Sequence, residues 1–386
     1  MYDSIVIGAG IAGIVVAREL AEKAKEKVLV IEKRDHIGGN CFDKQDEQGI
    51  LIHPYGPHIF HTNSQKVFDY LSQFTQWRHF KHEVAAKVNG EFIPVPFNLN
   101  SLYCVYSEEI AKSLEKKLID NYGLESSIPI LKLQNSDDVE IRKLAKDVYE
   151  LIFLKYTMKQ WGQTPDEVDP SVTGRVPVQI SYDNSYFQDR YQGVPELGYT
   201  KMFARMLDHP SIELQLGVDA KDQLKIYERR IEFSGRPFTG KVIYTGAIDE
   251  LFDYQEGALP YRSLDFRFEH YKAMNYQGYG VVNYTVSEEF TRITEFKLLT
   301  GQKTSDTTIV KEYPRDYLNP KTQIPYYAVL TKENQLIYEK YRQRTQNLDN
   351  FYLLGRLAEY QYFNMDVIVE RALNLSQSLM KKEMRT

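Results

Sequence analysis

The chain has 386 residues and a formal net charge of −5, so it is long enough for two or three domains and has no overall basic character that would attract nucleic acid. Its cysteines, Cys41 and Cys104, have neither a disulfide framework nor metal-ligand spacing, which indicates a reducing compartment. With no signal-peptide pattern and no run of about 18 apolar residues, we expect a soluble, cytoplasmic protein without membrane insertion.

The N-terminal segment predicts a β-α-β unit. Buried strands are expected at 3–7 and 27–31, with a helix at 14–24 between them, and the first strand enters that helix through the glycine turn GAGIAG at 8–13. This order of elements begins a dinucleotide-binding domain.

The glycine turn fits the pattern G-x-G-x-x-G. Gly8 permits a tight turn, Gly10 lets the backbone approach a pyrophosphate, and Gly13 lets the helix pack on the strand. Glu32 ends the second strand, where its carboxylate can accept hydrogen bonds from an adenosine ribose. A second glycine pair follows in RDHIGGN at 34–40, as in many FAD enzymes, and there is no second G-x-G-x-x-G. We therefore expect FAD and no resident NAD.

A run of histidines, HPYGPHIFHT, contains His53, His58 and His61. The spacing could gather a metal ion, but the run has no cysteine and no acidic residue. We expect no metal here and interpret the run as a polar loop that lies against the flavin ring.

The middle of the chain predicts two inserted lobes. Asn89-Gly90 between alternating residues predicts an antiparallel hairpin at 84–95. Apolar residues at helical spacing predict helices at 108–122 and 137–155. After residue 175, strands are expected to dominate up to about residue 330.

The last part of the chain is expected to return to the first sheet, with strands at 241–246 and 351–356 and a helix at 366–381. The predicted fold is α/β, a Rossmann-like FAD-binding domain interrupted by a helical lobe and an antiparallel-sheet lobe. The expected ranges are 1–76 with about 212–250 and 335–386 for the first domain, about 101–160 for the helical lobe, and about 77–100, 161–211 and 251–334 for the sheet lobe.

The stretch FTRITEF at 290–296 reads as a strand with Arg292 on the same face as Phe290 and Phe296. Other arginines also occur among aromatic residues, in a chain with 29 Tyr and 2 Trp. Stacked rings and guanidinium forks suit a nucleotide diphosphate, although most such residues in any protein are ordinary strand or surface residues.

Motifs along nearly the whole chain resemble those of the bacterial UDP-galactopyranose mutases. In order they are GAGIAG, EKRDHIGGN, H-x-YGPHIFHT, PVPFN, YTMKQWG, GRVPV, YFQDRYQG, YRSLDF, TRITEF, PYY and GRLAEYQYFNMD. The resemblance implies interconversion of UDP-galactopyranose and UDP-galactofuranose. In that family reduced flavin N5 attacks the anomeric carbon, UDP leaves, and the sugar ring opens and recloses. It also implies a nucleotide-sugar substrate, an external reductant such as NAD(P)H or a reductase, and a homodimer.

The resemblance assigns site residues by motif. As catalytic it gives Arg175, Arg292 and His58, the two arginines binding the diphosphate. As substrate-binding it gives Phe153, Tyr156, Thr157, Trp161, Tyr186, Asn98, Arg262, Asn283, Tyr326, Tyr362 and Asn364. As cofactor-binding it gives Gly8, Gly10, Ile11, Ala12, Gly13, Glu32, Lys33, Gly39, Asn40, His58, Ile59, His61, Arg356, Met365 and Asp366.

Alternatives follow from departures in the sequence. Many family members have Asp where this chain has Asn364, and some have His where it has Phe296. The same chemistry on UDP-N-acetylgalactosamine or dTDP-fucose is therefore an alternative. A flavin oxidase of the amine-oxidase type is another, and a binder like the guanine-nucleotide dissociation inhibitors, without flavin chemistry, is a third.

Overall fold

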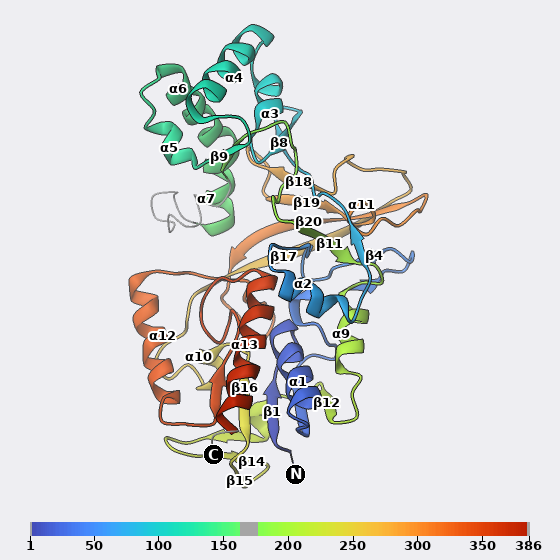
Figure 1. Ribbon diagram of the computed structural model, residues 1–386, viewed down its shortest axis with the longest axis vertical. Helices are drawn as coiled ribbons and strands as arrows, with labels where there is room; N and C mark the ends of the chain where they lie inside the picture. The colour runs from blue at the N-terminus through green and yellow to red at the C-terminus, as the bar shows by residue number, and fades with distance from the viewer. Residues whose placement is uncertain (1, 163–176, 384–386) are drawn as a thin grey trace.

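A computed structural model describes residues 2–162 and 177–383 of the chain. Figure 1 shows a helical lobe at one end, a large twisted sheet in the middle and a parallel-sheet domain at the other end, where both termini lie. Within the described ranges, no helix is both long and apolar enough to cross a lipid bilayer.

The parallel-sheet domain is built on a five-stranded sheet in the order β12-β2-β1-β16-β22. Its strands are β12 (Ile212–Leu216), β2 (Val28–Glu32), β1 (Ser4–Ile7), β16 (Lys241–Tyr244) and β22 (Phe351–Leu353). All neighbours are parallel, and β1 and β2 are buried along their whole length. This confirms the Rossmann-like domain and its late returning strands.

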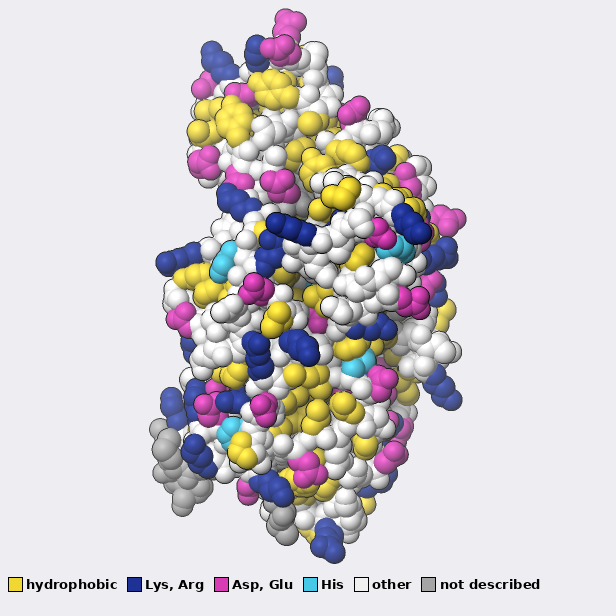
Figure 2. Space-filling model, turned by 90° about the vertical axis from the view of Figure 1, so that its right-hand side faces the viewer, with side chains coloured by type: hydrophobic (Ala, Val, Ile, Leu, Met, Phe, Trp, Pro, Cys, Tyr) yellow, Lys and Arg dark blue, Asp and Glu magenta, His cyan; other side chains and the backbone are white. Residues whose placement is uncertain are grey.

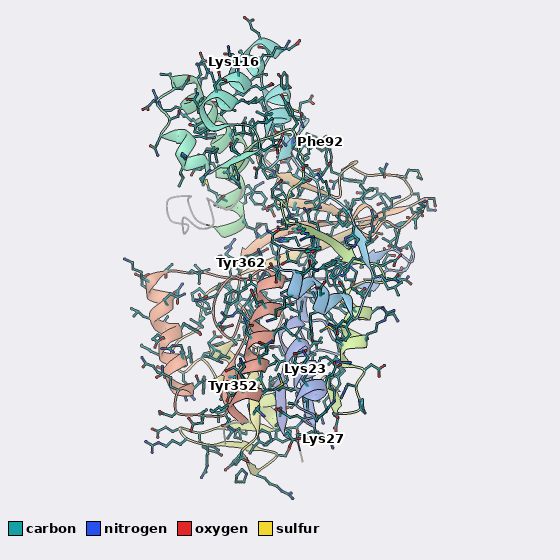
Figure 3. The ribbon with its side chains drawn as sticks, in the orientation of Figure 1. Lys23, Lys27, Phe92, Lys116, Tyr352 and Tyr362 are labelled. Carbon is teal, nitrogen blue, oxygen red and sulfur yellow. The ribbon has the colours of Figure 1, made fainter. Side chains whose placement is uncertain are left out.

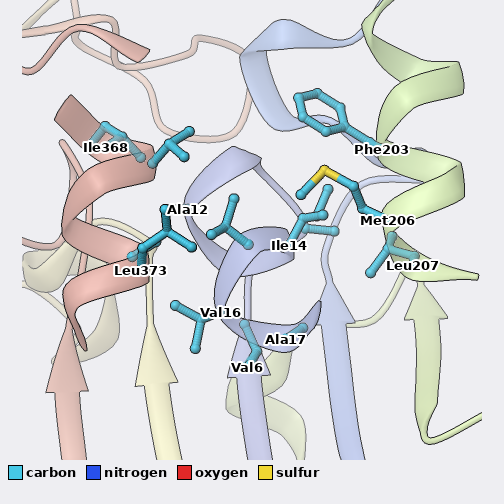
Figure 4. Packing of buried hydrophobic residues seen from close by; sticks show 14 of the residues in the cluster. Val6, Ala12, Ile14, Val16, Ala17, Phe203, Met206, Leu207, Ile368 and Leu373 are labelled. Atoms are coloured by element: carbon cyan, nitrogen blue, oxygen red, sulfur yellow. The ribbon is translucent and has the colours of Figure 1, made fainter. Parts of the chain in front are cut away.

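Helices cover one face of this sheet. The central helix is α1 (Ile11–Lys23), with α13 (Met365–Glu383) and α9 (Tyr199–Leu207) on its two sides. Figure 4 shows their apolar side chains meeting around α1. The other face is covered by a small antiparallel sheet of β13 (Leu224–Ile226), β14 (Ile231–Phe233) and β15 (Arg236–Phe238), near the short helix η3 (Ala220–Asp222).

The position of α9 differs from the predicted domain boundary, which assigned 161–211 to the sheet lobe. Tyr199, Met202 and Phe203 are buried in the same core as α1. An amphipathic helix belongs with the surface against which its apolar face packs, so α9 is part of the parallel-sheet domain.

The middle of the molecule is a seven-stranded sheet in the order β21-β17-β20-β19-β18-β7-β8. Its strands are β21 (Tyr327–Ala328), β17 (Tyr261–Tyr271), β20 (Thr307–Asp316), β19 (Arg292–Glu295), β18 (Val281–Tyr284), β7 (Val84–Val88) and β8 (Glu91–Val95). Every pair is antiparallel except β18 with β7. The predicted β7–β8 hairpin is present, and both turn residues, Asn89 and Gly90, have positive φ.

The FTRITEF strand is shorter than expected. Strand β19 ends at Glu295, and Phe296 begins the short helix α11 (Phe296–Thr300), so Phe290 and Phe296 lie outside the strand that carries Arg292. The buried carboxylate of Glu295 accepts hydrogen bonds from the amides of Tyr276 and Gln277, which stops the extended chain at that point.

The helical lobe packs around its own core and is inserted after β8. It consists of α3 (Leu99–Val105), α4 (Glu108–Tyr122), α5 (Ile130–Gln134), α6 (Val139–Val148), the π-helix η2 (Tyr149–Leu154) and α7 (Lys155–Trp161), with a two-stranded ribbon of β9 (Ser126–Ile128) and β10 (Val178–Ile180). The helix expected at 137–155 therefore exists, but its last turns are π-helical.

Shorter elements join these parts. They are η1 (Gly39–Cys41), the ribbon β3 (Lys44–Gln45) with β4 (Leu51–Ile52), the sheet β5 (Phe60–Thr62), β11 (Tyr191–Pro195) and β6 (Trp77–His79), and the helices α2 (Gln65–Ser72), α10 (Ile248–Leu251) and α12 (Lys332–Thr345). Figure 2 shows acidic and basic side chains interspersed over the face that it presents, as the small net charge predicts.

Candidate functional site

A central cavity of about 520 Å³ connects the parallel-sheet domain with the large sheet and the helical lobe. One end is lined by the glycine turn before α1 and by the loops that follow β2 and β16. The other end is lined by side chains of β18, β19, β20 and α7. We call these the glycine end and the arginine end.

The glycine end is built by two glycine turns that touch. Gly10 forms an isolated parallel bridge with Gly38, and a Cβ at Gly39 would lie 3.0 Å from the Cα of Gly10. A side chain at Gly13 would collide with the carbonyl oxygen of Gly8, so Gly13 serves the packing of α1 and does not line the cavity. Helix α1 begins without a side-chain cap, and its first amides lie at the cavity.

Glu32 lies at the same end and is buried. Its carboxylate accepts hydrogen bonds from the amides of Ala9 and Arg34, at 2.8 and 2.9 Å. Each carboxylate oxygen can accept another bond, so the side chain fixes the glycine turn and can still receive a ribose hydroxyl. Nη1 of the neighbouring Arg34 is buried without a hydrogen-bond partner in the described structure. Such an orphaned donor fits a site that holds a polar ligand.

The remaining cofactor candidates also line this part of the cavity, with one exception. Those that line it are Gly8, Gly10, Ile11, Ala12, Lys33, Gly39, Asn40, His58, Ile59, His61, Arg356 and Met365. Asp366 does not, because its carboxylate accepts a hydrogen bond of 2.9 Å from the hydroxyl of Thr62 and so ties the start of α13 to β5.

The histidine run lies on one wall. Nδ1 of His58 donates to the carbonyl of Gly56 at 2.8 Å, and burial lowers the pKa of His58 to about 3, so its ring is neutral near pH 7. His61 places Nδ1 2.8 Å from a carboxylate oxygen of Asp189 and stacks on Phe187. His53 is buried behind them. Among the described residues no group of three His, Cys, Asp or Glu side chains could hold a metal ion.

At the arginine end, three polar residues form a row across three strands. Asn283 on β18 is directly opposite Arg292 on β19, which is directly opposite Glu312 on β20. Nη2 of Arg292 donates to the hydroxyl of Tyr156 at 2.8 Å, while its Nε lies 3.8 Å from a carboxylate oxygen of Glu312. Arg292 is thus oriented by α7 and β20 and faces the cavity.

This row is not saturated with hydrogen bonds. Arg292 Nε, Asn283 Oδ1 and Glu312 Oε1 are all buried and have no hydrogen-bond partner in the part of the chain that the structure describes. Burial raises the pKa of Glu312, and the nearby charge of Arg292 opposes that shift. Unpaired buried polar atoms are costly, so a cluster of them at one wall indicates a polar ligand there.

Helix α7 and the preceding π-helix supply the facing wall. Phe153, Tyr156, Thr157 and Gln160 all line the cavity. A π-helical turn adds a residue to the turn, and it occurs here between α6 and α7, just where these side chains reach the cavity. Tyr186, Tyr326, Tyr362 and Asn364 complete the lining predicted from sequence. Figure 3 shows Tyr362 at the level where the helical lobe faces the parallel-sheet domain.

Two predicted substrate residues do not line the cavity. Asn98 is buried as the N-cap of α3, where its side chain accepts from the amide of Ser101. Arg262 is buried beneath α7. Its Nε donates to the carbonyl of Gln160 at 3.1 Å, and its guanidinium also pairs with Asp316.

Two further candidates cannot be placed. Arg175 lies outside the described residues, and of Trp161 only the backbone position at the end of α7 is described.

Several lining residues were not predicted. They are Arg34, Tyr55, His82, Gln160, Phe187, Glu312 and Tyr327. Gln160 stands within the quoted motif YTMKQWG and Tyr327 within PYY, so adjacency to Tyr156 and Tyr326 was a usable signal. Glu312 and His82 had none, because their place depends on strand register.

Comparison with known proteins gives consistent results. The profile of a family described as UDP-galactopyranose mutase matches residues 151–362, and that of an NAD(P)-binding Rossmann-like domain matches residues 6–74. A UDP-galactopyranose mutase of Mycoplasma pneumoniae is 35% identical over 98% of this chain and 96% of its own. A dTDP-fucopyranose mutase of Escherichia coli is 35% identical over 99% of both chains.

The fold is also similar to that of a solved structure. A crystal structure of reduced UDP-galactopyranose mutase superimposes with a TM-score of 0.72 at 17% identity, over 99% of this chain and 94% of the other. Its strands and helices thus follow the same course along almost the whole length.

Proposed function

Because the chain belongs to the family of UDP-galactopyranose mutases and is an isomerase, we propose that it interconverts UDP-galactopyranose and UDP-galactofuranose with FAD as its bound cofactor. The observation that supports this most directly is the continuity of the cavity. A dinucleotide held at the glycine end and a nucleotide sugar held at the arginine end would meet within it.

The residues at the glycine end fit FAD. Glu32 can receive the ribose, the amides at the start of α1 and the touching turns of Gly10 and Gly39 can hold the pyrophosphate, and the orphaned nitrogen of Arg34 offers a further donor. Reduced FAD would supply a nucleophilic nitrogen for the anomeric carbon, and the exchange would leave the sugar neither oxidised nor reduced overall.

At the arginine end the protein would hold the diphosphate in place while it is detached from the sugar. Arg292 offers unpaired N–H donors, and Tyr156 fixes its guanidinium from α7. Charge-assisted bonds to phosphate oxygens are the strongest that side chains make, and they hold a leaving diphosphate close enough to return. We propose Arg175 as a second diphosphate arginine from its motif alone.

Around the sugar, the unpaired Asn283 side chain and the tyrosines Tyr326 and Tyr362 offer hydroxyl and amide partners. His58 is neutral, and because its Nδ1–H is used by Gly56, its Nε2 is an acceptor. We propose that it orients a donor at the cofactor wall. An external reductant and a homodimer remain part of the proposal through the family resemblance.

The test is an anaerobic assay of dithionite-reduced protein with UDP-galactofuranose, read by chromatography. We expect UDP-galactopyranose to accumulate, and only a trace of it with oxidised protein. A protein purified without flavin, or one that leaves the substrate unchanged under reducing conditions, would contradict the proposal.

The sugar and base preference is a second question, because the dTDP-fucopyranose mutase is as similar in sequence as the UDP-galactopyranose mutase. Asn364 lines the cavity where many members have Asp. Parallel reactions with dTDP-fucofuranose and UDP-N-acetylgalactosaminofuranose rank the candidates by kcat/KM. The preferred substrate is the one with the highest ratio, and UDP-galactofuranose is expected to be it.

A further inference from the structure

His82 is a cavity residue to which neither the motifs nor the comparisons assign a role. It lies just before β7, and its side chain is only 4% exposed. Tyr186, Phe187 and Phe80 surround it, with ring centroids 5.8, 5.8 and 6.1 Å away. Its backbone carbonyl accepts from the amide of Tyr186, so the backbone is fixed.

The ring nitrogens of His82 make no hydrogen bond to any residue that the structure describes. Burial lowers the pKa of His82 to about 3, and the nearby Arg292 and His61 lower it further, so the ring is neutral near pH 7. A neutral imidazole has one N–H donor and one acceptor nitrogen. A buried group with both capacities unused faces a cavity in which a polar ligand would bind.

The position of His82 identifies the part of the ligand. Both Arg292 and His61 act on its charge, so it is near both. His61 stacks at 3.7 Å on Phe187, which also contacts His82. Under the proposed function, Arg292 holds the diphosphate and His61 belongs to the cofactor wall. The hexose must lie between these two, because its anomeric carbon is bonded to the diphosphate and has to reach the cofactor.

We propose that His82 is a sugar-binding residue, a neutral hydrogen-bond partner for a hydroxyl of the hexose carried by the nucleotide diphosphate. This inference rests on the proposed function and adds a determinant of sugar recognition. A hydroxyl both donates and accepts, and so does a neutral imidazole, whereas a phosphate oxygen only accepts. His82 thus complements Arg292, and the two divide recognition of sugar and diphosphate.

The test compares two ligands in one protein. His82→Phe keeps a ring and its aromatic neighbours but removes both hydrogen-bonding nitrogens, and His82→Gln keeps a neutral donor and acceptor. The matched control is His79→Phe on β6, an exposed histidine that does not line the cavity. Dissociation constants for UDP-galactose and for UDP are measured by calorimetry on the flavin-loaded enzyme, with flavin absorbance as the check on folding.

We expect His82→Phe to weaken UDP-galactose about tenfold while UDP binds within about twofold of the parent, since one neutral hydrogen bond is lost. His82→Gln should recover most of the loss, and His79→Phe should change neither constant. In turnover, KM for the sugar nucleotide should rise more than kcat falls.

Equal weakening of UDP and UDP-galactose, or no change in either, would overturn the inference. If the Phe variant is not recovered with flavin, His82→Ala gives the same comparison, because it only removes atoms from a wall of the cavity. A parent enzyme that binds neither ligand would instead contradict the proposed function, so the two failures are distinguishable.

Discussion

Arg292 combines three features that rarely occur together in a surface residue. Its guanidinium is held by Tyr156 and lies beside Glu312, its Nε has no hydrogen-bond partner among the described residues, and it faces the central cavity. A side chain that is oriented but unsaturated is prepared for a ligand.

We predict that Arg292→Ala lowers turnover at least about 100-fold while FAD stays bound, because two charge-assisted bonds to the diphosphate are lost. Arg292→Lys should recover little, since a point charge does not replace the fork. Activity and flavin absorbance are measured together, with the exposed Arg236→Ala on β15 as the control. Turnover near the parent rate in Arg292→Ala would remove this residue from the mechanism.

Single residues differed in how far sequence could place them. Arg292 and Tyr156 were predictable because each stands in a motif. Glu312 was not, since its relation to Arg292 arises only from the register of β19 with β20. Asn98 has the side chain of a ligand-binding residue and the position of an N-cap, and sequence alone did not separate the two roles.

At the scale of elements, α7 is the most consequential helix for the site. It presents Tyr156, Thr157 and Gln160 to the cavity, and its C-terminal carbonyls accept hydrogen bonds from Arg262 on β17. Lys159 donates to the carbonyls of Glu288 and Phe290, which follow β18. The helix is therefore tied to the large sheet by cations at its C-terminal end, where the helix dipole favours them.

We predict that Arg262→Met weakens UDP and UDP-galactose to a similar extent and lowers the free energy of unfolding by about 1–3 kcal/mol, because α7 loses its link to the sheet. The control is Arg315→Met, which removes the neighbouring but more exposed pair with Asp265 on the same two strands. Selective loss of UDP-galactose, with unchanged stability, would instead show that Arg262 contacts the sugar.

Elements with a local signal were predicted well. The glycine turn, the Asn89-Gly90 hairpin and α4 follow from patterns within about 15 residues. The π-helical turn after α6 and the end of β19 at Glu295 did not, because the first lies within one continuous helical pattern and the second depends on amides of residues 276 and 277. Long-range contacts decided what local preference left open.

For the molecule as a whole, buried histidines set a pH limit on stability. Burial lowers the pKa of His53 to about 4 and those of His58 and His82 to about 3. The unfolded chain binds protons at these residues near pH 6.5, whereas the folded protein does not. Each therefore favours unfolding as the pH falls below about 6.5, down to its own folded pKa.

We predict that the free energy of unfolding falls by about 1.4 kcal/mol per pH unit for each such histidine between pH 6 and 5. Urea midpoints at pH 7.5, 6.0 and 5.0 measure the slope. His53→Gln should remove one histidine's share, whereas the exposed His79→Gln should leave the slope as it is. Identical pH profiles for the parent and His53→Gln would show that His53 titrates normally in the folded protein.

The single parallel pairing in the large sheet, between β7 and β18, has a consequence for how the protein is made. Strands β7 and β8 and the helical lobe leave the ribosome early, but their sheet partner begins at residue 281, and β22, at the edge of the parallel sheet, begins at residue 351. Neither sheet can close during most of synthesis. Nascent chains that stop before β22 are thus expected to expose unpaired strand edges and to depend on chaperones until the last segment arrives.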